Sequence, residues 1–123
     1  MSKKERVVVL GASHKPERYS YKAIQALLNS GHEVIPVHPS LKEIQGLKVI
    51  NKLEDIKDKV DTVTLYVGPD RQEQMVDGIL ALKPKRIIAN PGAESDVMSK
   101  AADKNKIEYV EACTLVLLAT GQF

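Results

Sequence analysis

The chain has 123 residues with 18 Lys and Arg against 16 Asp and Glu, and this length predicts one domain over residues 1–123. A formal net charge of +2 and an aromatic content of 4% without Trp argue against a nucleic-acid or membrane-surface binder. A single Cys, no signal peptide and no apolar run long enough to span a membrane together predict a cytoplasmic protein.

The first strand is expected at residues 6–10, a short run of β-branched residues and leucine that ends at Gly11. Glycine lacks the Cβ that would obstruct a sharp turn off the strand. A polar, cationic loop follows, and an amphipathic helix is expected at residues 21–30, with Ser20 before it and Gly31 after it. The order of strand, cationic loop and helix is typical of a phosphate-binding unit.

This loop has the chemistry to hold an anion. The backbone N–H groups of residues 21–23 are expected to be unpaired at the positive end of the helix dipole. Hydroxyls of Ser13 and Ser20 and the charges of Lys15 and Arg18 would add donors. The later glycines of G-x-G-x-x-G are absent, which weakens a dinucleotide assignment. In the alternative interpretation, Ser20 only caps the helix and both cations are solvated surface charges.

The next part of the chain contains a second strand and a less regular stretch. The strand is expected at residues 33–37, with an irregularity at Pro36 because proline cannot donate to the ladder. The patterns that follow favour a helical turn at residues 41–44, a short edge strand at 48–50 and another turn at 53–56.

The second half of the chain alternates strands with helices. Asp70 and Ser95 are expected to cap two helices, and Asn105 to end the second one in a left-handed conformation. Residues 114–120 favour a helix over a strand. Three strands are expected, at residues 61–67, 86–89 and 107–110. The buried helix positions are expected to be Met75, Val76, Ile79, Leu80, Val97, Met98, Ala101 and Ala102.

This alternation predicts a Rossmann-like, doubly wound parallel sheet in a three-layer α/β/α domain. Right-handed crossovers place every strand-to-helix loop at one edge of the sheet, where ligands of open α/β sheets bind. NAD-binding domains have an acidic residue at the end of the second strand, but His38 occupies that place here. Together with Lys15 and Arg18, it suits a nucleotide with an extra phosphate on its ribose, so NADP and coenzyme A both qualify.

Four short motifs stand out, and these are Gly11-Ala12-Ser13, the S-x-x-P-x-R-x-S-Y pattern of residues 13–21, Gly31-His32-x-Val34-x-Pro36-Val37-x-Pro39, and Asn90-Pro91-Gly92-Ala93-Glu94. In this order they resemble the stand-alone CoA-binding domain family. That family is similar to the CoA-binding domain of the succinyl-CoA synthetase alpha subunit and of ADP-forming acyl-CoA synthetases. The likeness covers nearly the whole chain, with one departure, because position 38 is commonly Asn in the family and is His here.

The resemblance implies a Rossmann-like domain whose first loop cradles the phosphates of CoA or an acyl-CoA. It also implies that His38-Pro39 and Gly68-Pro69 flank the adenosine, and that residues 90–93 run beside the pantetheine arm. The cofactor-binding residues expected from the loop and the resemblance together are Gly11, Ala12, Ser13, Lys15, Arg18, Ser20, Tyr21, His38, Pro39, Gly68, Pro69, Asn90, Pro91, Gly92 and Ala93.

The sequence offers little for catalysis. The histidines have no metal-ligand spacing, no G-x-S-x-G nucleophile elbow is present, and ligand contact is the better role for His14 and His38. The histidine that the synthetases phosphorylate lies in a following domain, which this sequence does not contain. Cys113 follows the last strand, where a mixed disulfide with the CoA thiol is one hypothesis and a packing role is the alternative. We therefore expect a binding protein that has no catalysis of its own and no metal.

Two other functions stay open. One is a small NADP-dependent oxidoreductase or a redox-sensing nucleotide-binding module. The other is an interaction subunit whose apolar segment at residues 115–119 docks on a partner enzyme or on a second copy of the chain. For that segment we favour a core helix, because a small sheet needs its last face covered.

Overall fold

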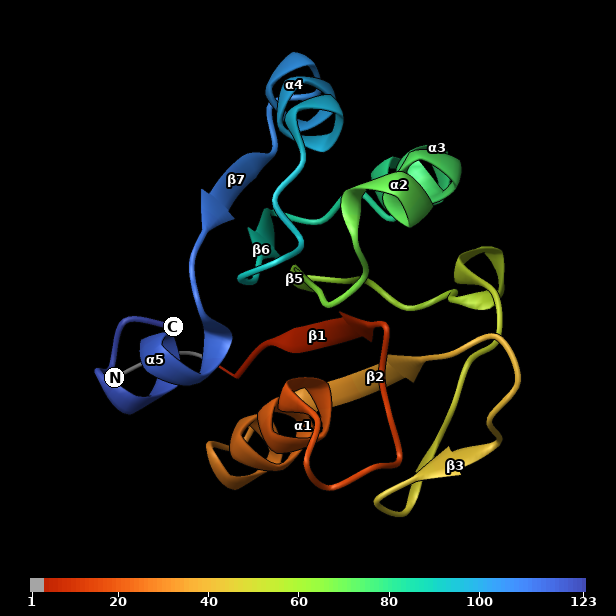
Figure 1. Cartoon of the computed structure of the whole chain (residues 1–123), viewed down its shortest axis with the longest axis vertical. Coiled ribbons are helices and arrows are strands. Elements are labelled where there is room, and N and C mark those ends of the chain that lie inside the picture. Colours follow the sequence, from red (N-terminus) through yellow and green to blue (C-terminus); the bar gives the residue numbers. More distant parts are fainter. Residues whose placement is uncertain (1–3) are drawn as a thin grey trace.

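The computed structural model describes residues 4–123. Its centre is a parallel sheet of five strands in the order β2-β1-β5-β6-β7 (Figure 1). The strand order reverses between β1 and β5, the position at which a doubly wound sheet opens a crevice at the carboxyl ends of its strands. The five strands are β1 (Arg6–Leu10), β2 (Glu33–Val37), β5 (Thr62–Leu65), β6 (Arg86–Ala89) and β7 (Glu108–Glu111).

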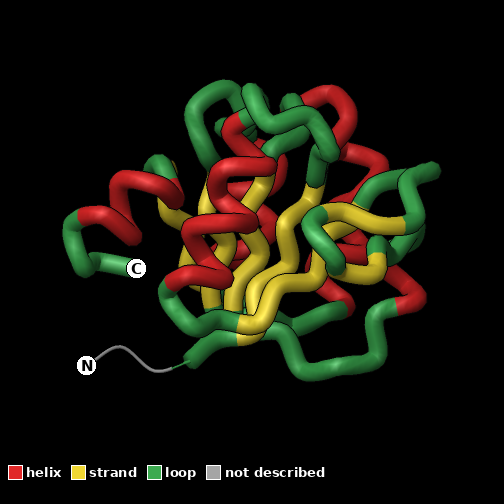
Figure 2. The backbone as a smooth tube through the Cα atoms, turned by 90° about the horizontal axis from the view of Figure 1, so that it is seen from below, coloured by secondary structure: helices red, strands yellow, loops and turns green. Residues whose placement is uncertain are grey.

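Helices cover both faces of this sheet, which Figure 2 shows as a central layer between helices. On one face α1 (Tyr19–Asn29) contacts α5 (Thr114–Ala119). On the other face lie α2 (Pro69–Gln72), α3 (Val76–Ala81) and α4 (Asp96–Lys104), and a 3-10 turn at Glu73–Met75 joins α2 to α3. The chain therefore forms the Rossmann-like α/β/α fold that the sequence predicts.

Strand β1 lies between two separate apolar cores, because successive side chains of a strand point to opposite faces. Val7 and Val9 pack with Ile24 and Leu27 of α1. Val8 packs in the other core, against residues of α3 and α4. All three valines are completely buried, so the strand that leads into the site is held rigidly from both sides.

The expected helical turn at residues 41–44 is wrong. The chain forms a small antiparallel hairpin there, with β3 (Glu43–Ile44) paired to β4 (Leu47–Lys48), and only Ile50 of the expected edge strand bridges to the main sheet. Burial decides the conformation, because Ile44 is 2% exposed and packs in the core of α1. Two strand residues on each side are too few to produce a recognisable sequence period.

Pro36 does not disturb the sheet, contrary to expectation. It pairs with Val9 in a register that is continuous along β1 and β2. Because β2 ends the sheet at this side, the missing N–H faces the outer edge, where only Ile50 N–H donates to the Pro36 carbonyl and His38 N–H donates to the Ile50 carbonyl. An edge strand tolerates the loss of this donor.

Two helices begin differently from expectation. Helix α1 begins at Tyr19, with Arg18 as its N-cap residue, instead of after Ser20. Helix α2 begins at Pro69 after Gly68, and no side chain caps it, so the expected Asp70 cap is wrong. Proline at the first helical position has no N–H to satisfy, which reduces the need for a cap.

Helix α4 has the expected start. Ser95 is its N-cap, and the Ser95 hydroxyl accepts a hydrogen bond from the Met98 N–H at 3.1 Å. The buried stripe is narrower than expected, because Val97 is 48% exposed. Asn105 is not left-handed, since Lys106 with φ of 59° takes that conformation at the turn before β7.

The final apolar segment is a helix, as the sequence favours. Helix α5 begins at Thr114 with Cys113 as its N-cap residue, and Leu118 packs against the core of α1. Val116 is 55% exposed. Within residues 4–123, none of the helices has the length and apolar character needed to cross a membrane.

Candidate functional site

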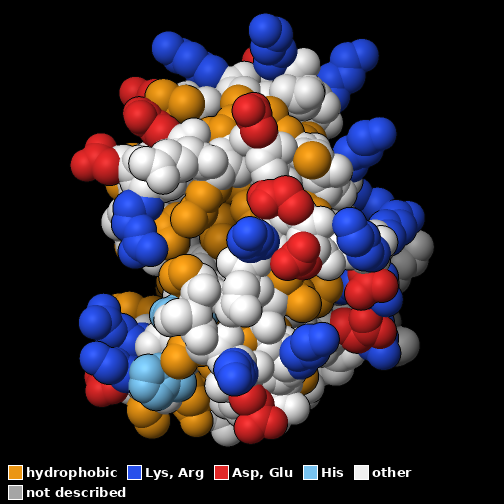
Figure 3. Space-filling view, turned by 90° about the vertical axis from the view of Figure 1, so that its right-hand side faces the viewer, with side chains coloured by type: hydrophobic (Ala, Val, Ile, Leu, Met, Phe, Trp, Pro, Cys, Tyr) orange, Lys and Arg blue, Asp and Glu red, His pale blue; other side chains and the backbone are white. Residues whose placement is uncertain are grey.

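A cleft of about 770 Å³ opens where β1, β2 and β5 end. Figure 3 views the molecule from the side to which β1 and β2 point in Figure 1, and it shows a hollow with Lys and Arg side chains above and below it. The cleft is lined by most residues that the sequence singles out, and these are Gly11, Ala12, Ser13, Lys15, Arg18, Ser20, His38, Pro39, Pro91, Gly92 and Ala93.

The floor of the cleft depends on the turn at Gly11. This residue has φ of +92°, and a Cβ there would lie 3.0 Å from the backbone of Tyr66 and from a methyl group of Val67. The N–H groups of Gly11 and Ala12 both donate to the Val37 carbonyl, at 3.2 and 3.1 Å. Glycine is therefore required both for the left-handed turn and for the close approach of β1 to the end of β5.

The start of α1 faces the cleft with free backbone donors. The N–H groups of Tyr19, Ser20 and Tyr21 have no acceptor in the described chain, while Lys22 N–H already bonds the Arg18 carbonyl. The free amides thus lie two residues earlier than the sequence suggests. No acidic side chain occupies the first turn, so the positive end of the helix dipole has no counter-charge there.

The loop before α1 is folded so that its cations flank these amides. Ser13 Oγ accepts the Lys15 N–H at 3.1 Å, and the Lys15 carbonyl accepts the Arg18 N–H at 3.0 Å. Both Lys15 and Arg18 are exposed, line the cleft and form none of the ion pairs found among residues 4–123.

A second wall of the cleft was missed by the sequence analysis. It consists of the segment before and through the 3-10 turn at Leu53–Asp55 together with one face of α2 and α3. Arg71, Met75 and Gly78 are spaced three to four residues apart, the pattern of one helix face. That spacing was the available signal, but the sequence analysis assigned only Met75, with Val76, Ile79 and Leu80, to a buried stripe and did not consider Arg71 or Gly78. The residues of this wall are Asn51, Lys52, Leu53, Glu54, Arg71, Gln74, Met75 and Gly78.

His38 lies between the two walls and is held in one tautomer. Its Nδ1 accepts the N–H groups of Ser40 and Leu41, each at 3.1 Å. A neutral imidazole that accepts at Nδ1 carries its proton at Nε2. Burial, followed by the charges of His14 and Arg71, lowers the pKa of His38 below its ordinary value of 6.5. His38 is therefore a neutral donor at the cleft.

Four of the expected site residues do not line the cleft. Tyr21 packs on the core of α1, and Gly68 and Pro69 lie at the start of α2. Asn90 is 2% exposed, and its side chain is fully used inside the protein. Its amide group donates to Thr64 Oγ1 and to the Leu65 carbonyl, and its Oδ1 accepts the Thr114 N–H at 2.8 Å.

Tyr66 lines the cleft, and its buried hydroxyl has no hydrogen-bond partner within residues 4–123. Burial raises the pKa of Tyr66 to about 12, so the phenol remains protonated. Cys113 is half-buried and does not line the cleft. Within residues 4–123, no three His, Cys, Asp or Glu side chains gather as metal ligands.

Comparison with known proteins gives a solved structure of the same fold and a curated relative with a partial sequence match. A crystal structure of an uncharacterized protein is 42% identical and superposes with a TM-score of 0.94, covering 99% of this chain and 100% of that chain. The curated protein YneT of Bacillus subtilis (strain 168) is 29% identical over 79 residues, which are 64% of this chain. The match spans only 56% of YneT.

A larger protein contains the same fold as one part. The acetyl-coenzyme A synthetase 1 of Ca. Korarchaeum cryptofilum, solved with phosphate and ADP, has a TM-score of 0.75 and 22% identity, over 88% of this chain and 25% of that chain. At this identity the likeness concerns the fold. A family model described as the CoA binding domain matches residues 5–119, and the chain therefore belongs to the CoA binding domain family.

Proposed function

We propose that this protein binds coenzyme A or an acyl-CoA in the cleft at the carboxyl edge of its sheet, without catalysis of its own. One observation carries the proposal. The free amides of α1 and unpaired cations open into one cleft, which four Lys and Arg side chains and a single Glu give a net charge of +3. Such a surface is stabilised by a ligand with several phosphate charges.

Polar and apolar groups of the cleft both contribute to the expected free energy of binding. Two or three charge-assisted hydrogen bonds contribute roughly 1.5 to 3 kcal/mol each, and a helix terminus adds about 0.3 to 1 kcal/mol. Association costs about 4 to 15 kcal/mol, so the apolar contacts along the cleft must add to these polar contributions. Leu10, Val37 and Met75 supply such contacts beside the polar groups.

The side chains at the cleft favour binding over chemistry. Nδ1 of His38 is occupied by two backbone donors and Nε2 carries the proton, so this imidazole is not placed to accept a proton from a substrate. Of the described residues that line the walls, Glu54 is the one carboxylate, and it is exposed. A general acid or base usually sits in a more enclosed position, where its pKa is tuned.

Calorimetric titration with CoA, dephospho-CoA, NADPH and NADH tests the proposal. We expect micromolar binding of CoA, weakened about tenfold or more by Arg18→Ala because a charge-assisted bond is lost. Lys100→Ala is the control, since this cation is exposed on α4 and does not line the cleft. Binding of NADPH but not CoA would refute the CoA proposal and support the NADP-dependent alternative.

The absence of catalysis needs its own measurement. Acyl-CoA incubated with a stoichiometric amount of protein is expected to remain unchanged when followed by mass spectrometry. Hydrolysis or transfer of the acyl group that disappears in Arg18→Ala would contradict this part of the proposal. Protein purified without reductant should also show no CoA adduct, because Cys113 does not line the cleft.

A further inference from the structure

The cations of the cleft fall into two groups on different walls. Lys15 and Arg18 come from the loop before α1. Lys52, from the segment before the 3-10 turn, and Arg71, from α2, belong to the second wall. Arg71 is exposed, and it forms none of the ion pairs or side-chain hydrogen bonds found among residues 4–123. The second group is not needed for a diphosphate that already has the free amides and two cations of α1.

His38 follows the end of β2 and lines the same cleft as the second group of cations. Its Nε2–H has no partner among the described residues, and the side chain lines the same cleft as Arg71 and His14. The charges that act on His38 come from His14 and Arg71, and no carboxylate contributes. This part of the cleft is therefore electropositive and carries an unused donor, which is the environment a phosphate requires.

The hydrogen bonds in the loop at His38 show how a histidine can replace the Asn that is common at this position. Nδ1 accepts N–H groups two and three residues ahead, at Ser40 and Leu41, a pattern that Asn or Asp side chains commonly form in turns. An imidazole can fill this structural role with one nitrogen and still present a donor from the other. An Asn oxygen at the same place would leave only the short amide group as a donor.

We propose that Arg71, together with His38 Nε2–H and His14, forms a second anion subsite that binds the phosphate on the ribose of the bound nucleotide. This inference rests on the proposed function and assigns the diphosphate to the loop of Lys15 and Arg18. Arg71 is then a specificity-determining residue, because it distinguishes a nucleotide with a ribose phosphate from one without. CoA and dephospho-CoA differ in this one group.

Calorimetry tests this proposal. Wild type and Arg71→Ala are each titrated with CoA and with dephospho-CoA. Wild type is expected to bind CoA about tenfold more tightly than dephospho-CoA. Arg71→Ala should abolish this preference by weakening CoA alone, and Arg71→Lys should keep part of it. Arg18→Ala should weaken both ligands and leave their ratio unchanged, since it acts on the diphosphate.

A second readout separates this role from a structural one. Adenosine 3′,5′-bisphosphate should shift the NMR signals of the His38 ring, AMP should shift them much less, and Arg71→Ala should remove the difference. Thermal unfolding of Arg71→Ala should match wild type because the side chain is exposed. The subsite is refuted if wild type binds both CoA forms equally, or if Arg71→Ala weakens both by the same factor. Both outcomes leave the CoA-binding proposal standing, whereas failure to bind either form refutes both proposals.

Discussion

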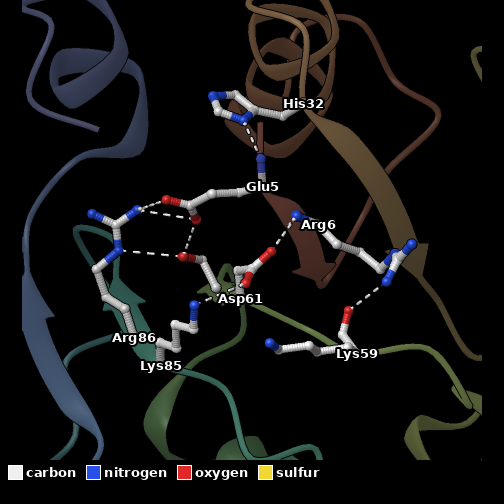
Figure 4. A network of polar contacts seen from close by, with 8 residues as sticks. Glu5, Arg6, His32, Lys59, Asp61, Lys85 and Arg86 are labelled. Carbon is white, nitrogen blue, oxygen red and sulfur yellow. Dashed lines mark hydrogen bonds and ion pairs between the residues drawn. The ribbon is translucent and has the colours of Figure 1, made fainter. Parts of the chain in front are cut away.

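The amino edge and the carboxyl edge of the sheet differ in whether their charged side chains form ion pairs. At the amino edge, Arg6 pairs with Glu33 at 2.8 Å. Arg86 pairs with Glu5 at 3.4 Å in the same region (Figure 4). Lys85 also reaches Asp61 there, at 3.7 Å. At the carboxyl edge none of the cleft cations takes part in an ion pair among the described residues.

Both edges contain a hollow, so shape alone does not separate them. The amino-edge hollow of about 350 Å³ is lined by three basic and three acidic side chains and is therefore electrically balanced, whereas the carboxyl-edge cleft has a net charge of +3. Charges that satisfy one another stabilise the fold, and charges left without partners indicate a ligand of the opposite sign. The amino-edge hollow is lined by Lys4, Glu5, Asp61, Thr62, Lys85, Arg86 and Glu108.

The largest expected effect on binding comes from introducing an acidic side chain at the carboxyl edge. Arg18→Glu removes a charge-assisted bond and adds repulsion, so CoA affinity should fall by about 100-fold or more, which corresponds to about 2.7 kcal/mol. Because Arg18 is exposed, the thermal midpoint should stay near that of wild type. Calorimetry and circular dichroism give the two values, and unchanged affinity would place the ligand elsewhere.

At the carboxyl edge the side chain of Asn90 forms a buried hydrogen-bond network that stabilises the fold. Asn90→Ala leaves Thr114 N–H and the Leu65 carbonyl without this side-chain partner, and both lie in the core. We expect a loss of about 2 to 4 kcal/mol in the free energy of unfolding. Urea denaturation measures it, and Asn105→Ala, which removes an exposed bond, is the control. A loss no larger than that of the control would contradict the structural role.

At the amino edge, removing a cation should lower the stability of the fold and leave ligand binding unchanged. Arg86→Met removes a cation that is 15% exposed and leaves Glu5 without its ion pair, which should cost about 1 to 2 kcal/mol of stability. The contact of the Arg86 guanidinium over the Phe123 ring, at 4.5 Å, is lost as well. CoA affinity should not change. Adding Glu5→Gln should restore part of the stability, and a drop in CoA affinity would show that the two edges are coupled.

The smallest effect concerns pH. The pKa of His38 is lowered in the folded state relative to 6.5, so the unfolded chain takes up its proton first as the pH falls. The stability contributed by the neutral form is present above about pH 6.5 and decreases as the pH falls toward the folded pKa. NMR titration of the His38 imidazole in the folded protein and in the urea-unfolded chain checks this. A folded pKa at or above that of an unstructured histidine would refute the assigned tautomer.

The amino edge has a pH response of its own at more acidic values. The hydrogen bond from Arg6 lowers the pKa of Glu33 below 4.5. Its contribution to stability is therefore present above about pH 4.5 and is lost as the pH falls through the lower folded value. The contribution of His38 therefore begins to fall below about pH 6.5, and that of Glu33 only below about pH 4.5.

Much of the fold could be predicted because its signals are local. Strands β1, β2 and β6 contain short apolar runs, β5 and β7 are shorter mixed segments that still carry β-branched or aromatic residues, and the long helices α1 and α4 have a periodic face. The five strands and the α/β/α layers follow from this alternation. The hairpin at β3 and β4 could not be predicted, because Ile44 adopts its conformation through burial against α1. Tertiary contacts override weak local preferences in such short segments.

The two walls of the candidate site also differ in whether local sequence signals could predict them. The sequence by itself determined the wall made by Gly11, Lys15 and Arg18, because a strand, a glycine turn and a helix start lie within fifteen residues and need no distant partner. Only the tertiary structure decided the other wall, since Arg71 lies on α2, which follows β5, and β5 comes to lie beside β1 only when the sheet has formed. It also decided which charges remain unpaired, because an ion pair such as Arg86 with Glu5 joins residues that are far apart in the chain and adjacent only after the sheet has formed.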